Sequence, residues 1–411
     1  MRKISVSDLL VIVIFGLIIY TGVGGVFNYT SELMVLFTVL VGIKAMNGKN
    51  GYYIRAKYNF FDLYLIVIFS MLLISYFNSY SRSETMPYII RFAVYIVLYQ
   101  IVFDKEKVVR IINYMFKYAT VIAIVYIICY PIFGNQSGIL RTYQGTGISM
   151  SIAMCIFVAY FFSHDKVSIN KYICAGLIVI ALMFTGKRTL FLIPAIVLVI
   201  VFMLAKDKKK YNKTGKLVLA GIVAIIGLIV TVPSARNVFV RIQEGMSDTT
   251  LSYRVYFWEY ATMMWEKKPL FGWGFGTMPY HIGHAGVDLK KYGYIESYLA
   301  HNIYYEMLAE IGTIGCIIFC VFFISFLVFT IYKIVQGKNI MSTNEKFLMY
   351  LSLGWQIWFI VYGFTGNPLY MVDECWLYFI ALILCNSVYF KKRKYYKIKI
   401  SLNEKVTART Y

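Results

Sequence analysis

Charged side chains are scarce in this sequence. Only 15% of its 411 residues are Asp, Glu, Lys or Arg, whereas a typical soluble domain has about 25%. The mean hydropathy is +0.66, and several apolar runs approach the roughly 20 residues that span a bilayer. This composition excludes a large soluble core. It predicts an all-α, polytopic integral membrane protein that forms a single membrane domain over 1–411.

Acidic residues are scarcer than basic ones. The chain has 20 Asp and Glu against 41 Lys and Arg, which gives a formal net charge of +21. In a soluble protein this balance would suggest a nucleic-acid partner. Here most basic residues fall in short loops between apolar runs, where they orient the spans, and no zinc, RRM or helix-turn-helix pattern is present. We therefore expect no nucleic acid as a partner.

Metal-binding side chains are also few. All seven cysteines lie in or at the edge of apolar runs. Cys316 and Cys320 stand one helical turn apart, but no further His or Cys pair accompanies them. We interpret them as small core residues and expect neither a metal nor a cofactor.

Hydropathy predicts about twelve spans, each helical because lipid cannot satisfy unpaired backbone polar groups. Basic residues concentrate in one set of loops and at both ends of the chain, so both termini are predicted to be cytoplasmic. The longest polar stretch, 234–310, is then a large extracytoplasmic loop with short helices between spans nine and ten. The predicted spans are 8–27, 31–46, 59–77, 86–103, 112–133, 147–163, 171–185, 189–205, 217–233, 311–333, 346–364 and 371–390.

Within this loop, SDTTLSYRVYFWEYATMMWEKKP predicts a helix that Asp248 to Thr250 can cap and Pro269 stops. Its aromatic content suggests that it lies on the membrane surface, with Arg254 beside its apolar stripe. The stripe is formed by side chains at three- and four-residue spacing, namely Leu251, Val255, Trp258, Thr262 and Trp265.

The next segment, PLFGWGFGTM, has three glycines at alternate positions. It lacks the preceding strand and the following Gly-Lys-Ser/Thr of a phosphate loop, so we do not expect it to bind a nucleotide. The glycines are expected to let the backbone turn closely under the preceding helix.

A histidine and two carboxylates follow in LAHNIYYEMLAEIGTIG, directly before a long apolar run. Asn302 can cap a short helix over 303–310 that Gly312 ends. His301 then lies at the helix entrance near the outer membrane surface. Because histidine accepts protons near neutral pH, His301 is the candidate general base, although a lone histidine can also be purely structural.

Other residues of the loop leave alternatives open. Glu306 and Glu310 are either a second base or a structural pair, and as exposed helix residues they would need no function at all. His281 and His284 lie in a glycine-flanked segment and are equally well explained as surface residues.

Three arginines are predicted at the outer ends of the spans, where ionisable residues are costly and usually functional. Arg188 follows the turn in FTGKRTLF, Arg91 lies about five residues into span four, and Arg254 lies on the surface helix. Guanidinium groups suit bidentate contacts with phosphate oxygens, so the three can converge on a lipid-anchored substrate. The alternatives are an interfacial anchor for Arg188, and snorkelling or a pair with Glu32 for Arg91.

Three ordered segments together resemble the bacterial O-antigen ligase and polysaccharide polymerase superfamily over about 180–320: TGKRTLFL, LSYRVYFWEYATMMWEKKPLFGWGFG and HNIYYEMLAEIGTIG. The first departs from the family pattern, because Lys187–Arg188–Thr189 lacks the usual glycine. The resemblance implies a metal-independent glycosyltransferase that uses glycan linked to undecaprenyl pyrophosphate. On that analogy, Arg188 and Arg254 bind the pyrophosphate and His301 activates the acceptor hydroxyl. The remaining substrate-binding candidates are Arg91, Lys187, Asn302, Glu306 and Glu310.

The favoured function is a polysaccharide polymerase in the bacterial cytoplasmic membrane, which joins lipid-linked repeat units at the outer face. The alternative is an O-antigen ligase that moves glycan to another acceptor, such as lipid A core. A lipid-linked oligosaccharide transporter or flippase would favour inverted repeats and charges at the midplane, whereas no repeat is found here. Beyond its substrate and the bilayer, the expected partners are other polysaccharide export and chain-length proteins.

Overall fold

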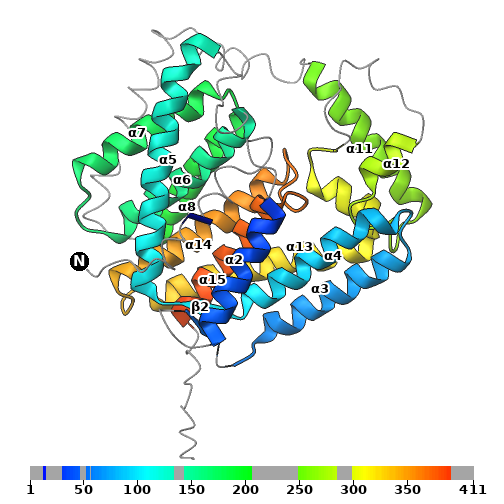
Figure 1. The fold of residues 1–411 in the computed structure, drawn as a ribbon, viewed down its shortest axis with the longest axis horizontal. Coiled ribbons are helices and arrows are strands. Elements are labelled where there is room, and N and C mark those ends of the chain that lie inside the picture. The colour runs from blue at the N-terminus through cyan, green and yellow to red at the C-terminus, as the bar shows by residue number, and fades with distance from the viewer. Residues whose placement is uncertain are drawn as a thin grey trace, which may run out of the picture.

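The computed structural model describes residues 13–14, 30–46, 52–55, 57–133, 143–205, 249–284 and 299–389. Helices dominate this part of the chain (Figure 1). They are α2 (Thr30–Met46), α3 (Phe60–Phe77), α4 (Arg82–Tyr99), α5 (Lys105–Phe133), α6 (Tyr143–Ser163), α7 (Ile169–Phe184), α8 (Arg188–Ala205), α11 (Thr249–Lys267), α12 (Met278–His284), α13 (Ile303–Gly337), α14 (Thr343–Tyr362) and α15 (Val372–Tyr389).

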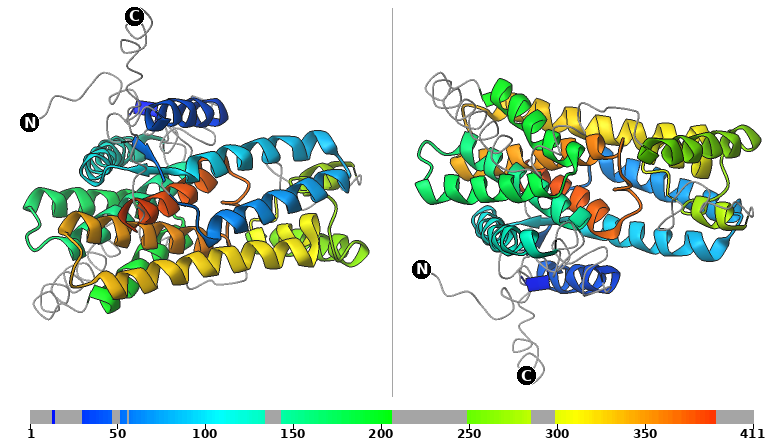
Figure 2. Two further views of the ribbon diagram at one scale, coloured as in Figure 1. Left: turned by 90° about the horizontal axis from the view of Figure 1, so that it is seen from below. Right: turned by 90° about the horizontal axis from the view of Figure 1, so that it is seen from above.

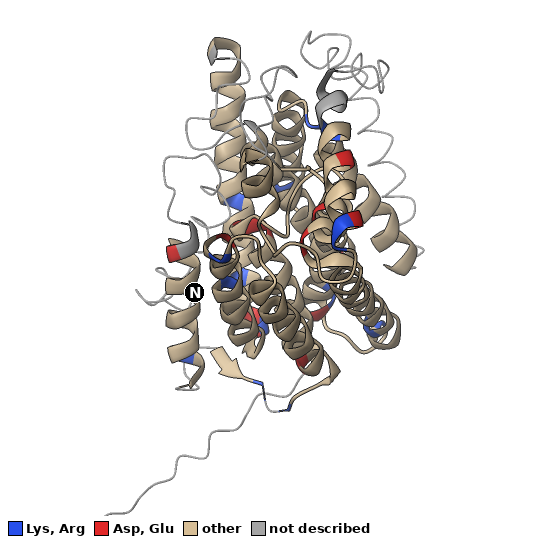
Figure 3. Cartoon of the chain, turned by 90° about the vertical axis from the view of Figure 1, so that its right-hand side faces the viewer, with Lys and Arg blue, Asp and Glu red and all other residues tan. Residues whose placement is uncertain are grey.

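Six of the described helices are long and apolar enough to cross a membrane: α3, α5, α6, α8, α13 and α15. Helix α7 is apolar but shorter. Few positions along these helices carry Lys, Arg, Asp or Glu (Figure 3). The expected helical, multi-pass architecture is therefore confirmed. The count of about twelve spans stays a prediction, and of spans 8–27 and 217–233 only residues 13–14 are among those described.

Hydropathy did not predict the two short strands. Strand β1 (Tyr52–Ile54) pairs antiparallel with β2 (Ile101–Phe103). Strand β2 occupies the end of predicted span 86–103, so that span is wrong at its boundary: α4 already ends at Tyr99. β-branched and aromatic side chains favour the extended conformation, and the pairing supplies partners for backbone groups that a helix would otherwise satisfy.

The strands define one end of the bundle, here called the hairpin end. At this end Lys105 forms an ion pair with Glu345 at the start of α14. The Ser387 hydroxyl near the end of α15 accepts the backbone N–H of Phe103 at 2.8 Å. The Tyr389 hydroxyl donates to the Lys333 carbonyl at 2.7 Å. Several loops that the sequence assigned to the basic side therefore gather at this end.

The opposite end, here called the site end, collects the α3–α4 turn, the glycine loop 269–277, the start of α13 and the α14–α15 connection. The backbone N–H of Tyr80 donates to the Trp273 carbonyl at 2.7 Å, and that of Ile303 donates to the Gly363 carbonyl at 2.9 Å. Figure 2 shows the long helices running along one direction, with α11 and α12 at this end.

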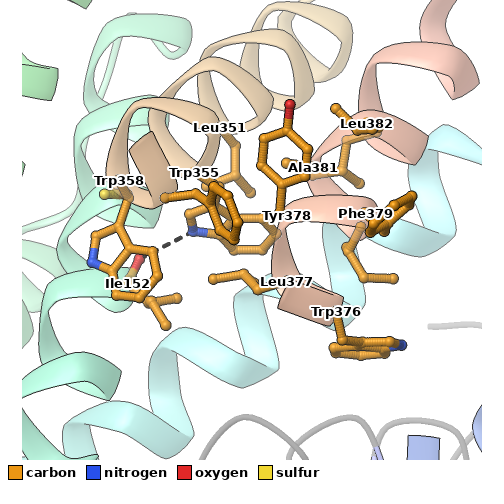
Figure 4. Close-up of a cluster of buried hydrophobic side chains, with 14 of the residues drawn as sticks. Ile152, Leu351, Trp355, Trp358, Trp376, Leu377, Tyr378, Phe379, Ala381 and Leu382 are labelled. Carbon is orange, nitrogen blue, oxygen red and sulfur yellow. Dashed lines mark hydrogen bonds between the residues drawn. The ribbon is translucent and has the colours of Figure 1, made fainter. Parts of the chain in front are cut away.

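The centre of the bundle is formed by helices that are apolar on all sides. In the apolar windows of α6 and α15, 89% and 83% of residues are buried, against 33% in those of α8 and α13. A helix that is hydrophobic all round belongs in the interior. Trp355 and Trp358 of α14 and Trp376 of α15 are fully buried here (Figure 4). The Trp355 indole N–H donates to the Ile152 carbonyl of α6 at 3.3 Å.

Candidate functional site

The glycine loop runs against the first turns of α13. Gly272, Gly274 and Gly276 all have positive φ angles, of 66°, 114° and 81°. The backbone N–H of Gly274 donates to the Glu310 carbonyl at 2.8 Å. A Cβ at Gly272 would lie 2.3 Å from the backbone carbon of Glu310. The glycines allow a close turn, as predicted, but the backbone that Gly272 approaches is that of the following helix α13, whereas the sequence predicted the preceding helix. The approach of two backbones leaves no room for a side chain.

Helix α13 begins and breaks where the sequence predicted. The Asn302 side chain caps it by accepting the backbone N–H of Tyr304 at 3.0 Å. Gly312 has φ 66° and ψ −174° and interrupts the helix. The N–H groups after the break do not lose their partners, because those of Thr313 and Ile314 donate to carbonyls of the glycine loop at 2.7 and 3.3 Å.

The two carboxylates of this first segment are buried. Glu306 and Glu310 are both 0% exposed, so the expectation of exposed helix residues was wrong. The cause is that the glycine loop and the α14–α15 connection cover this face of α13. The Glu310 carboxylate oxygens accept the backbone N–H groups of Gly276 and Met278 at 2.7 and 2.8 Å. Glu310 therefore anchors the glycine loop.

Glu306 holds a different segment. Its Oε1 accepts the backbone N–H of Ala300 at 2.8 Å and the side-chain amide of Asn367 at 3.0 Å. Its Oε2 is buried and has no hydrogen-bond partner among the described residues. Asn367 comes from the α14–α15 connection, so Glu306 joins three chain segments next to His301.

His301 has a left-handed backbone, with φ 50°, which is the one positive φ of a non-glycine residue in the described part of the chain. The left-handed conformation costs an L-residue roughly 1–2 kcal/mol. Its neighbours hold it: Ala300 donates to Glu306, the Ala300 carbonyl accepts the Trp258 indole N–H at 2.9 Å, and Asn302 caps α13. Strain maintained in this way is common at functional sites.

Positive charges from two other elements act on His301. Burial, followed by the charges of Arg254 on α11 and Lys187 in the α7–α8 turn, lowers the pKa of this imidazole to about 4. The ring is therefore neutral at pH 7 and able to accept a proton. Arg254 and Lys187 therefore act electrostatically on His301, and the roles predicted for Arg254 and His301 stay predictions.

Arg188 is placed by the turn between α7 and α8. It is half-buried and forms the first residue of α8, directly after Lys187. The preceding Gly186 turns the chain with φ 65°, so the predicted tight turn between two apolar helices is present. A Cβ at Gly147 would lie 3.2 Å from the Thr185 hydroxyl oxygen, which packs this turn against the start of α6.

Arg91 lies under the glycine loop. Its Nη1 donates to the Tyr370 carbonyl at 3.3 Å, and its guanidinium lies 5.0 Å from the centroid of the Tyr88 ring. The rings of Tyr88 and Tyr370 pack on Phe275 of the glycine loop, with ring centroids 5.0 and 4.9 Å from that of Phe275. These contacts give Arg91 a supporting position, and its predicted convergence with Arg188 and Arg254 on one substrate stays a prediction.

Helix α11 ends at Lys267, before Pro269, as predicted. The predicted apolar stripe was wrong in register. Val255 is exposed, whereas the buried residues are Phe257, Tyr260, Ala261 and Met264. They form a second hydrophobic cluster with α12, with Ala300 next to His301, and with Ala309 of α13. The partner surface thus selects the buried face. Asp248 and the side chain of Leu251 lie outside what the structure describes.

Sequence reasoning missed two polar contacts at this end. Asn367, in the short polar stretch of FTGNPLY, could have been noticed as an amide between two apolar spans. The second is between His281 and Tyr260, whose hydroxyl lies 2.7 Å from His281 Nδ1. Burial, followed by the charges of Lys267 and Lys268, lowers the pKa of His281.

No group of three or more His, Cys, Asp or Glu that could hold a metal occurs among the described residues; metal independence stays a prediction.

The site combines a multi-pass helical bundle, a neutral histidine and a set of cations at one end, which suits a membrane enzyme of the glycosyltransferase type. Residues 173–320 match the family described as O-antigen ligase. The matched region includes the Lys187–Arg188 turn, α11, the glycine loop and His301. This match supports the resemblance to the O-antigen ligase and polymerase superfamily over the matched residues. No curated protein matches its sequence.

Proposed function

We propose that this protein is a polysaccharide polymerase, which transfers glycan from undecaprenyl pyrophosphate to a lipid-linked repeat unit at the outer face of the bacterial cytoplasmic membrane. The observation that carries the proposal is the position of His301. It is held in a left-handed turn, neutral, beside Arg254 and Lys187. A base next to fixed positive charge suits a reaction in which an acceptor loses a proton while a phosphate leaves.

The bonds change in one displacement. The acceptor hydroxyl gives its proton to the His301 imidazole as its oxygen attacks the anomeric carbon of the donor sugar. A new glycosidic bond forms, the bond from that carbon to the phosphate oxygen breaks, and undecaprenyl pyrophosphate departs with the electron pair. Arg254, Lys187 and Arg188 stabilise the negative charge that develops on its oxygens. Proton transfer from the imidazolium to water then restores the base.

Substrate binding should change the pKa of His301. Burial together with Arg254 and Lys187 disfavours its protonated form. A bound pyrophosphate brings negative charge to the same cations and offsets their effect on the ring, so the pKa of His301 rises in the complex. The imidazole thus becomes a stronger base when both substrates are in place.

The other predicted site residues fall into positioning roles. Asn302 caps the helix that follows His301, Glu306 holds the residue before it, and Glu310 holds the glycine loop. These contacts suit residues that orient His301 and the glycine loop better than residues that touch the substrate. Such support from surrounding residues sets how accurately a catalytic group is placed.

The site end is proposed to be extracytoplasmic and both termini cytoplasmic, because the basic loops gather at the hairpin end. Nucleotide sugars are absent outside the cytoplasm, so a lipid-linked donor is then required. Cysteine labelling of intact cells tests this, in a background without native cysteines. His284→Cys, exposed on α12, should react with an impermeant reagent. Tyr58→Cys, which replaces a side chain that is 85% exposed at the hairpin end, should react only after permeabilisation. The reverse pattern would overturn the orientation.

A transfer assay with the purified full-length protein tests the reaction. It is supplied with labelled, undecaprenyl-pyrophosphate-linked repeat units, and either more of the same or lipid A core as acceptor. A ladder of lengths on the undecaprenyl carrier supports the polymerase. Transfer to lipid A core alone would establish the second candidate, a ligase, which the description of the matched family favours. Movement of the intact lipid across vesicles without a new glycosidic bond would show a transporter.

A further inference from the structure

Four aromatic rings meet at the site end, on the face formed by the α3–α4 turn, the glycine loop and α12. This aromatic patch consists of Tyr80, Trp273, Tyr280 and His281. The ring centroid of Tyr80 lies 6.2 Å from that of Trp273, 5.9 Å from that of Tyr280 and 4.9 Å from that of His281. Trp273 and His281 are 5.0 Å apart. The Tyr80 side chain is 50% exposed, and the other three are partly exposed.

The patch is held in place by hydrogen bonds. The Tyr80 N–H donates to the Trp273 carbonyl at 2.7 Å, and the Trp273 indole N–H donates to the Met264 carbonyl of α11 at 2.7 Å. The Tyr260 hydroxyl fixes the His281 ring through Nδ1 at 2.7 Å. A surface that is ordered before binding loses little conformational entropy when a ligand arrives.

Polar groups surround the rings. The Lys268 ammonium lies 4.1 Å from the centroid of the Trp273 ring. When the Tyr260 hydroxyl donates to Nδ1, the Nε2–H of His281 is left to donate to a ligand. The pKa of His281 is lowered, chiefly by burial, so this ring stays neutral at pH 7. The patch therefore offers ring faces together with hydrogen-bonding groups of several kinds.

Helix α11 connects the patch to the reaction centre. Trp258 of α11 bonds to the Ala300 carbonyl next to His301, and Met264 of α11 bonds to Trp273 of the patch. Six residues of helix separate these two positions, which corresponds to about 9 Å along its axis at 1.5 Å per residue. This is the scale of a short oligosaccharide that extends from a sugar placed at His301.

We propose that the aromatic patch binds the glycan chain of the lipid-linked substrate, beyond the sugar that reacts. This inference rests on the proposed function. The apolar C–H face of a pyranose ring packs on an aromatic ring, and its hydroxyls bond to His281 and Lys268. Aromatic residues that only mark the membrane interface form a belt around the bundle. Here they contact one another beside a lysine and a histidine.

Binding is tested with free oligosaccharide of one and of several repeat units, released by mild acid from the host's own lipid-linked glycan. Its affinity for the full-length protein in nanodiscs is measured by the change in tryptophan fluorescence and by calorimetry. Tyr80→Ala and Tyr280→Ala should each weaken binding of the longer oligosaccharide by about 10-fold, the size expected when one aromatic residue of a binding surface is truncated. Tyr80→Phe keeps the ring and should bind nearly normally. Tyr58→Ala, at the hairpin end, is the matched control.

Transfer kinetics separate this inference from the proposed function. In the patch variants, KM should rise for the longer chains and kcat should change little. The effect should appear for the donor or for the acceptor, according to which glycan occupies the patch. If the wild-type protein transfers glycan and every patch variant binds and uses long and short chains as well as the wild type does, the patch alone is overturned. Wild-type protein that binds oligosaccharide but transfers none would overturn the proposed function. Absence of binding by wild-type protein would also overturn the patch.

Discussion

The Glu306 carboxylate accepts the backbone N–H of Ala300 at 2.8 Å, so the helix that follows His301 holds the residue that precedes it. Asn367 donates to the same carboxylate oxygen at 3.0 Å and adds a contact from the α14–α15 connection. His301 lies between the two ends of this link, in a conformation that an unsupported histidine would leave. A buried carboxylate in this place therefore sets the geometry of the proposed base.

Glu306→Ala should lower kcat by about 100-fold, the size expected when a catalytic group is displaced by roughly 1 Å, and donor KM should change little. Glu306→Gln should recover much of the loss because its amide oxygen can still accept the Ala300 N–H. Asn367→Ala should act in the same direction, more weakly. The measurement is single-turnover transfer, with the exposed Glu259→Ala of α11 as control. If Gln is as slow as Ala, Glu306 takes part in proton transfer itself.

Loss of the His301 imidazole should slow transfer by about 100-fold or more, within the range for loss of a general base. His301→Asn is the preferred variant, because Asn tolerates the left-handed backbone but cannot act as the base. His301→Gln keeps a hydrogen-bonding side chain and should also be slow. His284→Gln, at the same end, serves as control. A fast His301→Gln enzyme with an unchanged pH profile would remove His301 from the mechanism.

The pH dependence should have an acid limb set by His301. Its pKa in the free protein is lowered to about 4, so the imidazole is unprotonated and active above that pH, and kcat/KM should fall as pH drops toward it. In the substrate complex, negative charge beside Arg254 and Lys187 raises the pKa, so the acid limb of kcat should lie at higher pH than that of kcat/KM. The assignment would be contradicted if the acid limbs of kcat and kcat/KM lay at the same pH and the same limbs were also seen with His301→Asn.

Arg188→Lys should lose most activity, by roughly 10-fold or more, since lysine keeps the charge but not the planar pair of donors that grips phosphate. Transfer by equal amounts of purified protein is compared with that of Arg82→Lys. Arg82 is exposed at the site end and stacks on Tyr76, 5.8 Å from its ring centroid. A near-normal ladder of polymer lengths from Arg188→Lys would instead indicate an interfacial anchor.

Gly272→Ala should lower the stability of the protein. Its φ of 66° costs an L-residue roughly 1–2 kcal/mol, and the new Cβ would require the Glu310 backbone to move. Gly176→Ala, in the middle of α7, is the control: its Cβ meets nothing within 4 Å, and alanine is the better helix former. Thermal unfolding in detergent should show a lower Tm for the first variant only. Equal Tm values would show that the loop adapts.

Several local features were determined by the sequence alone. Asn302 and Gly312 bound a helical segment because capping and left-handed glycine depend on neighbouring backbone groups. The turn before Arg188, the stop before Pro269 and the glycine loop follow from the same local chemistry. Long apolar runs determine membrane-crossing helices, since lipid offers backbone groups no other partner.

Other features were decided only by the tertiary structure. The buried face of α11 depends on α12, Ala300 and the first turns of α13, which periodicity within one helix cannot reveal. The burial of Glu306 and Glu310 depends on loops that reach them from 32 and 61 residues away. Strand β2 stands where the sequence predicted the last turn of a helix, because pairing with β1 supplies its backbone hydrogen bonds. The conformation and the lowered pKa of His301 arise from groups on α7–α8, α11 and α13, because charge and burial act through space and not along the chain.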